Sequence, residues 1–308
     1  MNPYYPKRFL TLDSVLKKEF GEKVVKIPLN AGLGCPNRDG SCGIGGCSFC
    51  SGKLSGEFAG SEELSLAQQF EETKKLYMNK WGETKYIAYL QSGTNTYAPV
   101  DYLRRIYYSA LSIENVVGLS IATRADCLDD DVLKLLEEIN SKTYLSVELG
   151  LQSSNDKTAG LINRGYGYEK FLSGYNMLRQ AGVKTCIHII NGLIGEDKED
   201  MLKTALDVAR LEPYEVKIHL MYVVAGTLDE KRYLNKELKA LELDEYINIV
   251  CDQLERLPPF TAVGRLTGDG DRKTLVAPLW SRNKRAVLNG IDKELAKRNS
   301  IQGMLWGK

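Results

Sequence analysis

Short apolar, β-branched runs alternate with longer stretches of helical period along most of this chain. Six runs are predicted to be strands, at residues 24–29, 86–91, 116–122, 144–149, 184–190 and 215–224. This alternation predicts a parallel sheet whose strands are joined by crossover helices. Six βα units are fewer than the eight of a closed barrel, so we expect an α/β fold with a partial (β/α)6 barrel. Ligands should bind at the carboxyl ends of its strands.

Helix signals fill the intervening stretches. Ser65 to Gln68 forms a capping-box pattern, and apolar residues then recur at intervals of three or four. Helices are expected near residues 65–81, 99–107, 132–139, 168–180, 199–211, 233–257 and 286–298. We therefore expect a short N-terminal extension (1–20), a barrel (21–228) and a helical C-terminal extension packed on the barrel (229–308).

Charge and cysteine content narrow the class of protein. The 41 basic and 40 acidic side chains nearly cancel, so no overall positive field indicates nucleic-acid binding. Seven cysteines, of which up to four lie between residues 35 and 50, do not form the pattern of a secreted disulfide framework. The N-terminus lacks the apolar region of a signal peptide, and no apolar run is long enough to span a membrane. We expect a soluble cytoplasmic protein without a membrane partner.

A glycine-rich loop after the first predicted strand holds Cys35, Cys42, Cys47 and Cys50. Glycines let the backbone wrap closely around an inorganic centre and leave N–H groups free to donate hydrogen bonds to its sulfides. Soft thiolates select iron–sulfur clusters or zinc. The two-residue spacing between Cys47 and Cys50 suits both centres, so a structural zinc site that uses all four cysteines stays open at this point.

Several further motifs occur in a fixed order along the chain. They are CPNRDG (35–40), GGCSFC (45–50), QSGTNTYAP (91–99), LSIATRAD (119–126), VELGLQS (147–153), LINRG (161–165), HIINGLIGE (188–196), RLTGD (265–269) and APLW (277–280). Together they resemble the radical-SAM proteins of the YtqA/YhcC family, relatives of the catalytic subunit of Elongator. The resemblance covers most of the chain and implies a fold of the radical-SAM type.

The resemblance also implies the cofactors. In that family the cluster cysteines are separated by eleven and then two residues, which corresponds to Cys35, Cys47 and Cys50 and leaves Cys42 outside the set. Three protein ligands to a [4Fe–4S] cluster leave one iron for S-adenosylmethionine (SAM). The implied activity is reductive cleavage of SAM to a 5′-deoxyadenosyl radical, with an electron donor such as flavodoxin or ferredoxin as a partner.

Residues near the predicted strand ends take site roles by analogy with radical-SAM proteins. The expected cofactor contacts are Gln91, Ser92, Thr94, Asn95, Thr123, Arg124, Glu148, Gln152, Arg164 and Gly192. Ordinary alternatives exist, because residues 91–96 also suit a polar turn and Glu148 also suits a buried salt bridge. Arg164 also suits a surface position at a helix end, and Gly192 a common strand-to-helix turn.

His188, His219 and Tyr222 are expected to line the substrate pocket, together with Thr123, Arg124, Asp126 and Lys217. A single histidine in an apolar strand is more often a hydrogen-bonded core residue. Cys127, Cys186 and Cys251 are expected to be buried, inert thiols.

The family resembles tRNA-modifying enzymes, among them those of the MnmL type, which act on the side chain at carbon 5 of the wobble uridine. This implies tRNA as substrate and conversion of 5-carboxymethylaminomethyluridine to 5-aminomethyluridine. The chain has no room for the acetyltransferase domain of an Elongator catalytic subunit, so acetyl-CoA is not an expected partner. Two alternatives remain: radical chemistry on a small molecule or peptide, and a non-catalytic, zinc-stabilised RNA-binding protein.

Overall fold

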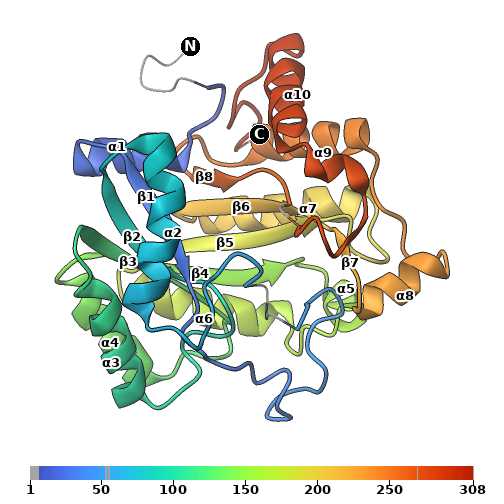
Figure 1. The fold of residues 1–308 in the computed structure, drawn as a ribbon. Coiled ribbons are helices and arrows are strands. Elements are labelled where there is room, and N and C mark those ends of the chain that lie inside the picture. The colour runs from blue at the N-terminus through green and yellow to red at the C-terminus, as the bar shows by residue number, and fades with distance from the viewer. Residues whose placement is uncertain (1–6, 53, 55, 269, 308) are drawn as a thin grey trace.

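A curled, all-parallel sheet of seven strands forms the centre of the molecule in the computed structural model (Figure 1). The structure describes residues 7–307 except 53, 55 and 269, with the backbone alone for 79–81. In sheet order the strands are β1 (Val24–Leu29), β2 (Lys85–Leu90), β3 (Val116–Thr123), β4 (Tyr144–Gln152), β5 (Lys184–Asn191), β6 (Glu215–Leu220) and β8 (Ala262–Arg265). Two short strands, β7 (Val223–Val224) and β9 (Leu275–Ala277), pair antiparallel beside it.

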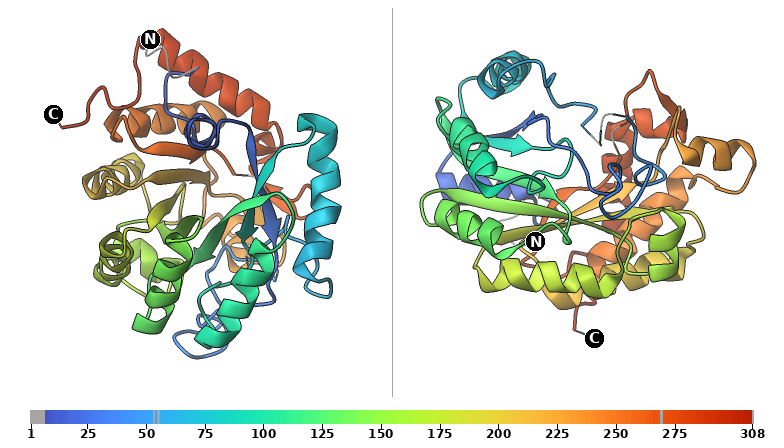
Figure 2. Two further views of the ribbon diagram at one scale, coloured as in Figure 1. Left: turned by 90° about the vertical axis from the view of Figure 1, so that its left-hand side faces the viewer. Right: turned by 90° about the horizontal axis from the view of Figure 1, so that it is seen from below.

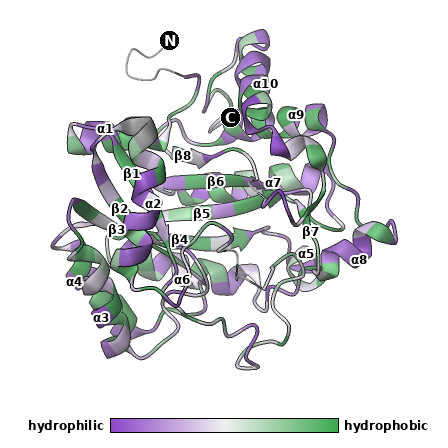
Figure 3. Ribbon diagram, in the orientation of Figure 1, coloured by the Kyte–Doolittle hydropathy of each residue, from purple (hydrophilic) through white to green (hydrophobic). Residues whose placement is uncertain are grey.

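Helices cover the outer face of this half-barrel (Figure 2). The crossover helices are α2 (Leu66–Trp81), α3 (Val100–Leu111), α4 (Asp130–Asn140), α6 (Tyr168–Gln180) and α7 (Lys198–Leu211). The remaining helices are α1 (Leu12–Phe20), α5 (Asp156–Leu161), α8 (Leu228–Leu234), α9 (Leu243–Arg256), the 3-10 helix η1 (Leu279–Arg282) and α10 (Lys284–Lys297). Helices α3, α8 and α10 carry both polar and apolar segments, as expected when one helix face is buried (Figure 3).

The sheet has an apolar outer face and a polar inner face. On β6, the side chains of Val216 and Ile218 are completely buried in the main apolar core. Lys217 and His219 alternate with them and line the cavity inside the curl of the sheet. Apolar burial against the helices therefore stabilises the barrel, while its interior is left for polar chemistry.

The partial barrel is confirmed, but it has seven strands instead of six. Strand β8 was not predicted, because four residues that include Gly264 give too short a pattern. The predicted strand 215–224 is divided into β6 and β7, and the predicted helix 233–257 is divided into α8 and α9. Helix α1 lies inside the predicted N-terminal extension, whose first six residues are outside the described part. The domain boundaries near residues 20 and 228 stay predictions.

The two ends of the described chain meet at the edge strand β8. The Val263 N–H donates to the Leu10 carbonyl (2.8 Å), and the Leu10 N–H donates to Gln302 Oε1 (2.8 Å). Helix α10 is held on α9 by Arg298, which donates to Asp252 Oδ1 (2.6 Å). The N-terminal segment is thus built into the sheet edge. In the part of the chain that the structure describes, no helix has the length and apolar character needed to cross a membrane.

Candidate functional site

A cavity of about 240 Å³ lies inside the half-barrel and reaches the loop after β1. Three cysteines of that loop, Cys35, Cys47 and Cys50, line this cavity. The fourth, Cys42, is exposed, does not line it, and has its Sγ 3.5 Å from Nη2 of Arg124. The structure therefore separates three cysteines from the fourth, as the family spacing implies.

Two asparagines hold the cysteine loop in shape. Asn37 Nδ2 donates to the Asn163 carbonyl (2.6 Å), and Asn163 Nδ2 donates to the carbonyls of Gly46 (2.8 Å) and Ile44 (3.1 Å). Asn163 follows α5 and adopts a left-handed φ of 53°, which asparagine tolerates better than most residues. Asn37 and Asn163 lie in the CPNRDG and LINRG motifs, but no individual role was predicted for either residue. The structural role of both is to clamp the loop.

A second clamp comes from Ser48, which lies between two of the cavity cysteines. Its N–H donates to the Ile162 carbonyl (2.9 Å), and its Oγ donates to Asp229 Oδ2 (2.9 Å). Asp229 is buried at the start of α8. The cysteine loop is therefore fixed by α5 and α8, both far from it in sequence.

The spacing of the thiols argues for a cluster and against a single zinc ion. Among the described residues, only Glu148, Cys186 and His188 place three potential ligand atoms within 4.8 Å of one another. Thiolates on one tetrahedral zinc, with bonds of about 2.3 Å, lie roughly 3.8 Å apart. The loop cysteines are more widely spread than that. Three spread thiols facing one cavity fit a multi-iron centre with one open corner.

The electrostatics of the loop agree with such a centre. Burial raises the pKa of Cys47 to about 12, and the neighbouring thiols of Cys50 and Cys35 act in the same direction. Without a cation the Cys47 thiol would stay protonated near neutral pH. A bound metal centre compensates the negative charge and favours the thiolate forms.

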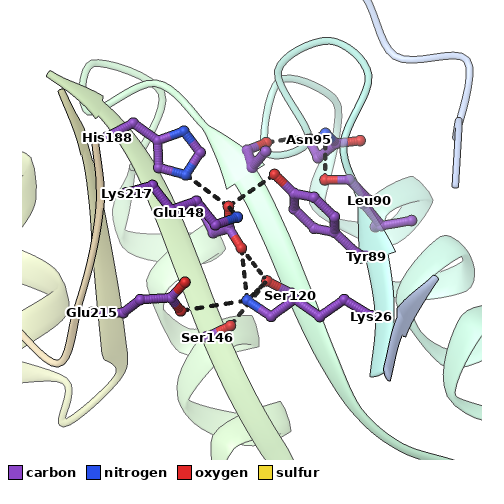
Figure 4. A network of polar contacts seen from close by, with 11 residues as sticks. Lys26, Tyr89, Leu90, Asn95, Ser120, Ser146, Glu148, His188, Glu215 and Lys217 are labelled. Carbon is purple, nitrogen blue, oxygen red and sulfur yellow. Dashed lines mark hydrogen bonds and ion pairs between the residues drawn. The ribbon is translucent and has the colours of Figure 1, made fainter. Parts of the chain in front are cut away.

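Glu148 on β4 is the centre of a buried polar network (Figure 4). Its Oε1 accepts from Lys26 Nζ (2.8 Å) and Ser120 Oγ (2.9 Å). Its Oε2 accepts from Tyr89 Oη (2.8 Å), from His188 Nε2 (2.7 Å) and from Lys217 Nζ. The side chain of Glu148 has no exposed surface.

This network bears on the expected cofactor contact of Glu148, which lines the cavity. A carboxylate offers about four acceptor positions, and Glu148 already has five donors around it. These contacts favour the buried salt bridge that the sequence left open beside a cofactor contact. Burial alone would raise the pKa of Glu148, but Lys217 and Lys26 hold that pKa well below its usual range. Glu148 is thus an ionised, salt-bridged carboxylate, and for the same reason the Glu148–Cys186–His188 group is not a metal site.

The other expected cofactor residues fall into two groups. The residues that line the cavity are Gln91, Thr94, Thr123, Arg124, Gln152 and Arg164. Gln152 ends β4 with a φ of +60°, an uncommon conformation that is frequent at functional sites.

Ser92, Asn95 and Gly192 do not line the cavity, contrary to expectation. Asn95 is fully buried, and its Nδ2 donates to three backbone carbonyls, including that of Ala122 (3.0 Å). The Gly192 N–H donates to Met201 Sδ (3.2 Å). The Asn95 amide and the Gly192 N–H are therefore hydrogen-bonded within the fold.

Arg164 is buried at the cavity wall, not on the surface. It donates to the backbone carbonyls of Tyr166, Ser153 and Leu151. Its Nη2 is buried and has no hydrogen-bond partner among the described residues, with Asp156 Oδ1 at 3.8 Å. A guanidinium nitrogen that makes only this long ion pair and no hydrogen bond to a described residue is suited to bind an anion such as the SAM carboxylate.

Arg124 is engaged differently. Its guanidinium pairs with Asp126 through two hydrogen bonds of 2.9 and 2.8 Å and packs over the Tyr166 ring at 4.8 Å from the centroid. Arg164 packs on the same ring at 4.7 Å. Tyr166, which sequence analysis missed, thus orients both arginines.

The three expected substrate residues, His188, His219 and Tyr222, all line the cavity. Burial lowers the pKa of His188 and lowers that of His219 well below its usual value, so both rings are neutral near pH 7. The ring centroids lie 5.0 Å apart. His188 is bound to Glu148, whereas His219 Nε2 is buried and lacks a hydrogen-bond partner among the described residues.

Of the three remaining cysteines, Cys186 and Cys251 are buried as expected. Cys127 is only partly buried, because it lies in the turn that follows β3.

Comparison with known proteins decides the family. The sequence matches the Radical SAM superfamily over residues 29–208 and the Radical_SAM C-terminal domain over residues 213–297. The chain belongs to the radical SAM superfamily. This radical SAM protein accordingly uses a [4Fe–4S] cluster and SAM, and it is a SAM-dependent enzyme. The alternative of a non-catalytic zinc protein is thereby dismissed.

Relatives of this radical SAM enzyme include YtqA of Bacillus subtilis, 48% identical over 297 residues, which are 96% of this chain and 92% of YtqA. YhcC of Escherichia coli is 35% identical over 95% of this chain and 94% of its own length. The tRNA uridine(34) acetyltransferase of Methanocaldococcus jannaschii is 27% identical over 159 residues, 50% of this chain and 28% of that protein. The resemblance to the YtqA/YhcC family is confirmed.

Among solved structures, Elp3 of Methanocaldococcus infernus has the same fold, with a TM-score of 0.66. The superposition covers 91% of this chain and 64% of that one at 16% identity. At this identity the likeness concerns the fold alone.

Proposed function

We propose that this radical SAM enzyme modifies tRNA by converting the 5-carboxymethylaminomethyl group of the wobble uridine to 5-aminomethyl. The observation that carries the proposal is the sequence likeness to a tRNA uridine(34) acetyltransferase over half of this chain. That protein's name places its action on uridine 34 of tRNA. The likeness covers 50% of this chain but only 28% of that protein, which supports a common target more than a common reaction.

Cys35, Cys47 and Cys50 would hold the cluster, which would supply the electron for reductive cleavage of SAM. An electron donor of the flavodoxin or ferredoxin kind would reduce it. The chain's own residues position the reactants: Arg164 Nη2 binds the SAM carboxylate, and Gln91, Thr94, Thr123 and Gln152 contact the rest of the cofactor from strand ends. The first change in the substrate is transfer of a hydrogen atom from the methylene of its carboxymethyl group to the 5′-deoxyadenosyl radical, which becomes 5′-deoxyadenosine. Loss of one further electron to an iron–sulfur acceptor would give an imine, and its hydrolysis by water would release glyoxylate and leave the 5-aminomethyl group.

Nucleoside mass spectrometry tests the proposal. Anaerobic, cluster-loaded enzyme is incubated with SAM, a reductant and tRNA from cells that lack this protein. We expect 5-carboxymethylaminomethyluridine to fall and 5-aminomethyluridine to rise in proportion, with 5′-deoxyadenosine formed. The Cys47→Ala variant should lose iron and give none of these products.

Two outcomes contradict the proposal in different ways. An unchanged wobble-uridine profile with active SAM cleavage would favour a small-molecule or peptide substrate. Conversion of tRNA by the Cys47→Ala variant would show that the reaction does not need the cluster.

A further inference from the structure

A second cavity of about 630 Å³ adjoins the first at the open edge of the half-barrel. It lies between the two edge strands, β1 and β8, with α1, α2 and α10 also contributing to its wall. The residues common to both cavities are Phe58, Tyr89, Gln91, Lys217 and Arg265. A ligand in the lateral cavity therefore reaches the barrel interior at Lys217 and Arg265, away from the cysteine loop.

The described lining of this lateral cavity is strongly basic. Asp13 is its one acidic residue, whereas the basic residues are Lys7, Lys23, Lys26, Lys217, Arg265 and Lys284. Several are neutralised within the protein, since Lys7 pairs with Asp292 (2.6 Å) and Lys23 with Asp13. At the junction of the cavities, three cations (Lys26, Lys217, Arg265) face two carboxylates (Glu148, Glu215).

Among the described residues, Arg265 carries the one positive charge at the junction that no carboxylate balances. It makes no hydrogen bond or ion pair with any residue that the structure describes, although it is partly buried between the two cavities. A partly buried guanidinium without a protein partner keeps its N–H donors available to a ligand. Such a group is expected where an anion binds.

A bulge in β8 directs Arg265 toward this junction. Val263 pairs with Val216 but Arg265 pairs with Lys217, so Gly264 is an additional residue in the register. Without the bulge, Gly264 would lie opposite Lys217. A Cβ on Gly264 would come within 1.9 Å of Glu215 Oε1, so a larger residue there would displace the Glu215 side chain. The local backbone thus places two cations side by side on adjacent strands.

His219 supplies a second unused group on the same wall. It lies two residues after Lys217 on β6, and its buried Nε2 has no partner among the described residues. Glu148 next to it is already saturated with donors and cannot accept a cation. The wall therefore offers a guanidinium and an imidazole, and it suits an anion with hydrogen-bond capacity.

We propose that Arg265, with Lys217 and His219 beside it, binds the carboxylate of the substrate. This inference rests on the proposed function, in which the substrate's carboxymethyl group carries one carboxylate and the product has none. The guanidinium fork pairs a carboxylate through two parallel hydrogen bonds. The 5-aminomethyl product is a cation near neutral pH, and the same basic wall repels it. One site thus favours substrate entry and product release.

The test compares two nucleosides that differ in the carboxylate: 5-carboxymethylaminomethyluridine and 5-methylaminomethyluridine. Their binding to cluster-loaded enzyme with SAM is measured by calorimetry for wild type, Arg265→Gln, Arg265→Lys and Lys293→Gln. Lys293 is an exposed residue of α10 and serves as the matched charge control. Because Arg265 has no partner within the described fold, its variants should keep the wild-type iron content and thermal midpoint.

We expect wild type and Lys293→Gln to prefer the carboxylate nucleoside by about tenfold or more, which is the effect of one charge-assisted contact. Arg265→Gln should lose that preference, and Arg265→Lys should keep part of it. With tRNA as substrate, Arg265→Gln should raise KM, whereas SAM binding stays unchanged.

Equal binding of both nucleosides by wild type, failure of wild type to bind either, or an unchanged preference in Arg265→Gln would overturn the inference. Conversion of tRNA by wild type would leave the proposed function intact in each of these cases. If wild type prefers the carboxylate nucleoside but converts no tRNA, the carboxylate site is supported and the proposed tRNA reaction is contradicted.

Discussion

At Glu148, one buried carboxylate accepts hydrogen bonds from two lysines, a tyrosine, a histidine and a serine. The partners come from different strands: Lys26 from β1, Tyr89 from β2 and Lys217 from β6. Each lysine would be costly inside the barrel without this negative charge. The negative charge of Glu148 therefore allows two lysines to lie inside the half-barrel.

Replacing Glu148 by Gln should destabilise the protein more than an ordinary substitution. The amide keeps the shape but leaves Lys26 and Lys217 together with too little negative charge. We expect the free energy of unfolding to fall by about 3 kcal/mol, as for other broken buried ion pairs. Anaerobic urea unfolding followed by circular dichroism measures it.

Glu63→Gln is the matched control, because Glu63 is exposed. The double variant Glu148→Gln/Lys217→Met should recover part of the loss, since it removes one of the uncompensated lysines. A Glu148→Gln protein as stable as Glu63→Gln would show that the network contributes little.

Among the elements, the cysteine loop depends on its contact with the loop after β2. Gly93 in that second loop has a φ of +78°, and a Cβ there would lie 2.1 Å from the Leu33 carbonyl oxygen. The Thr94 N–H donates to the Gly34 carbonyl (2.9 Å), directly before the first cluster cysteine. The two loops can approach this closely only because residue 93 is glycine.

Gly93→Ala should therefore displace the cysteine loop and weaken cluster binding. We expect at least a twofold loss of iron per chain after anaerobic reconstitution, with a matching loss of the brown absorbance. Gly52→Ala is the control, since a Cβ at Gly52 meets no atom within 4 Å. Equal iron in both variants would mean that the cluster tolerates movement of the loop.

Local sequence patterns predicted the elements well where a single segment carries the signal. The capping box at Ser65 and Gln68 is present at the start of α2, and six of the seven main strands follow their apolar runs. Strand β8 escaped because its pairing with β6 depends on a bulge at Gly264, which four residues cannot reveal. Patterns within one segment do not record pairing between distant segments.

The same limit explains the candidate site. Cys35, Cys47 and Cys50 were predicted as cluster ligands from spacing and resemblance, and the structure brings all three to one cavity. The ion pairs of Glu148 could not be predicted from the sequence, because a partner such as Lys26 is 122 residues away. No role was predicted for Arg265, which lies in the RLTGD motif. Its lack of a partner among the described residues is visible only in the folded structure.

For the whole molecule, closure of the sheet edge joins the two ends of the chain. Gln302 is buried and accepts from the Leu10 N–H (2.8 Å), while its Nε2 donates to the carbonyls of Pro258 (2.6 Å) and Thr261 (2.8 Å). One side chain thus connects the N-terminal segment, the C-terminal segment and the start of β8. The wall of the lateral cavity rests on this junction.

Gln302→Ala should loosen that junction by removing the side-chain partner of the Leu10 N–H and of the Thr261 carbonyl, together with one of the two donors to the Pro258 carbonyl. We expect the free energy of unfolding to fall by about 2 kcal/mol and the Val263 amide to exchange faster with solvent deuterium. Gln180→Ala, at an exposed position at the end of α6, should change neither quantity. Unaltered exchange at Val263 in Gln302→Ala would refute a closing role for Gln302.

The clamps on the cysteine loop also set an order of events during synthesis. The loop leaves the ribosome early, but the groups that shape it, Asn163 and Asp229, are made much later. Until residue 229 has emerged, the three thiols have no fixed arrangement for iron to occupy. Maturation of the metal centre should therefore follow synthesis of residue 229.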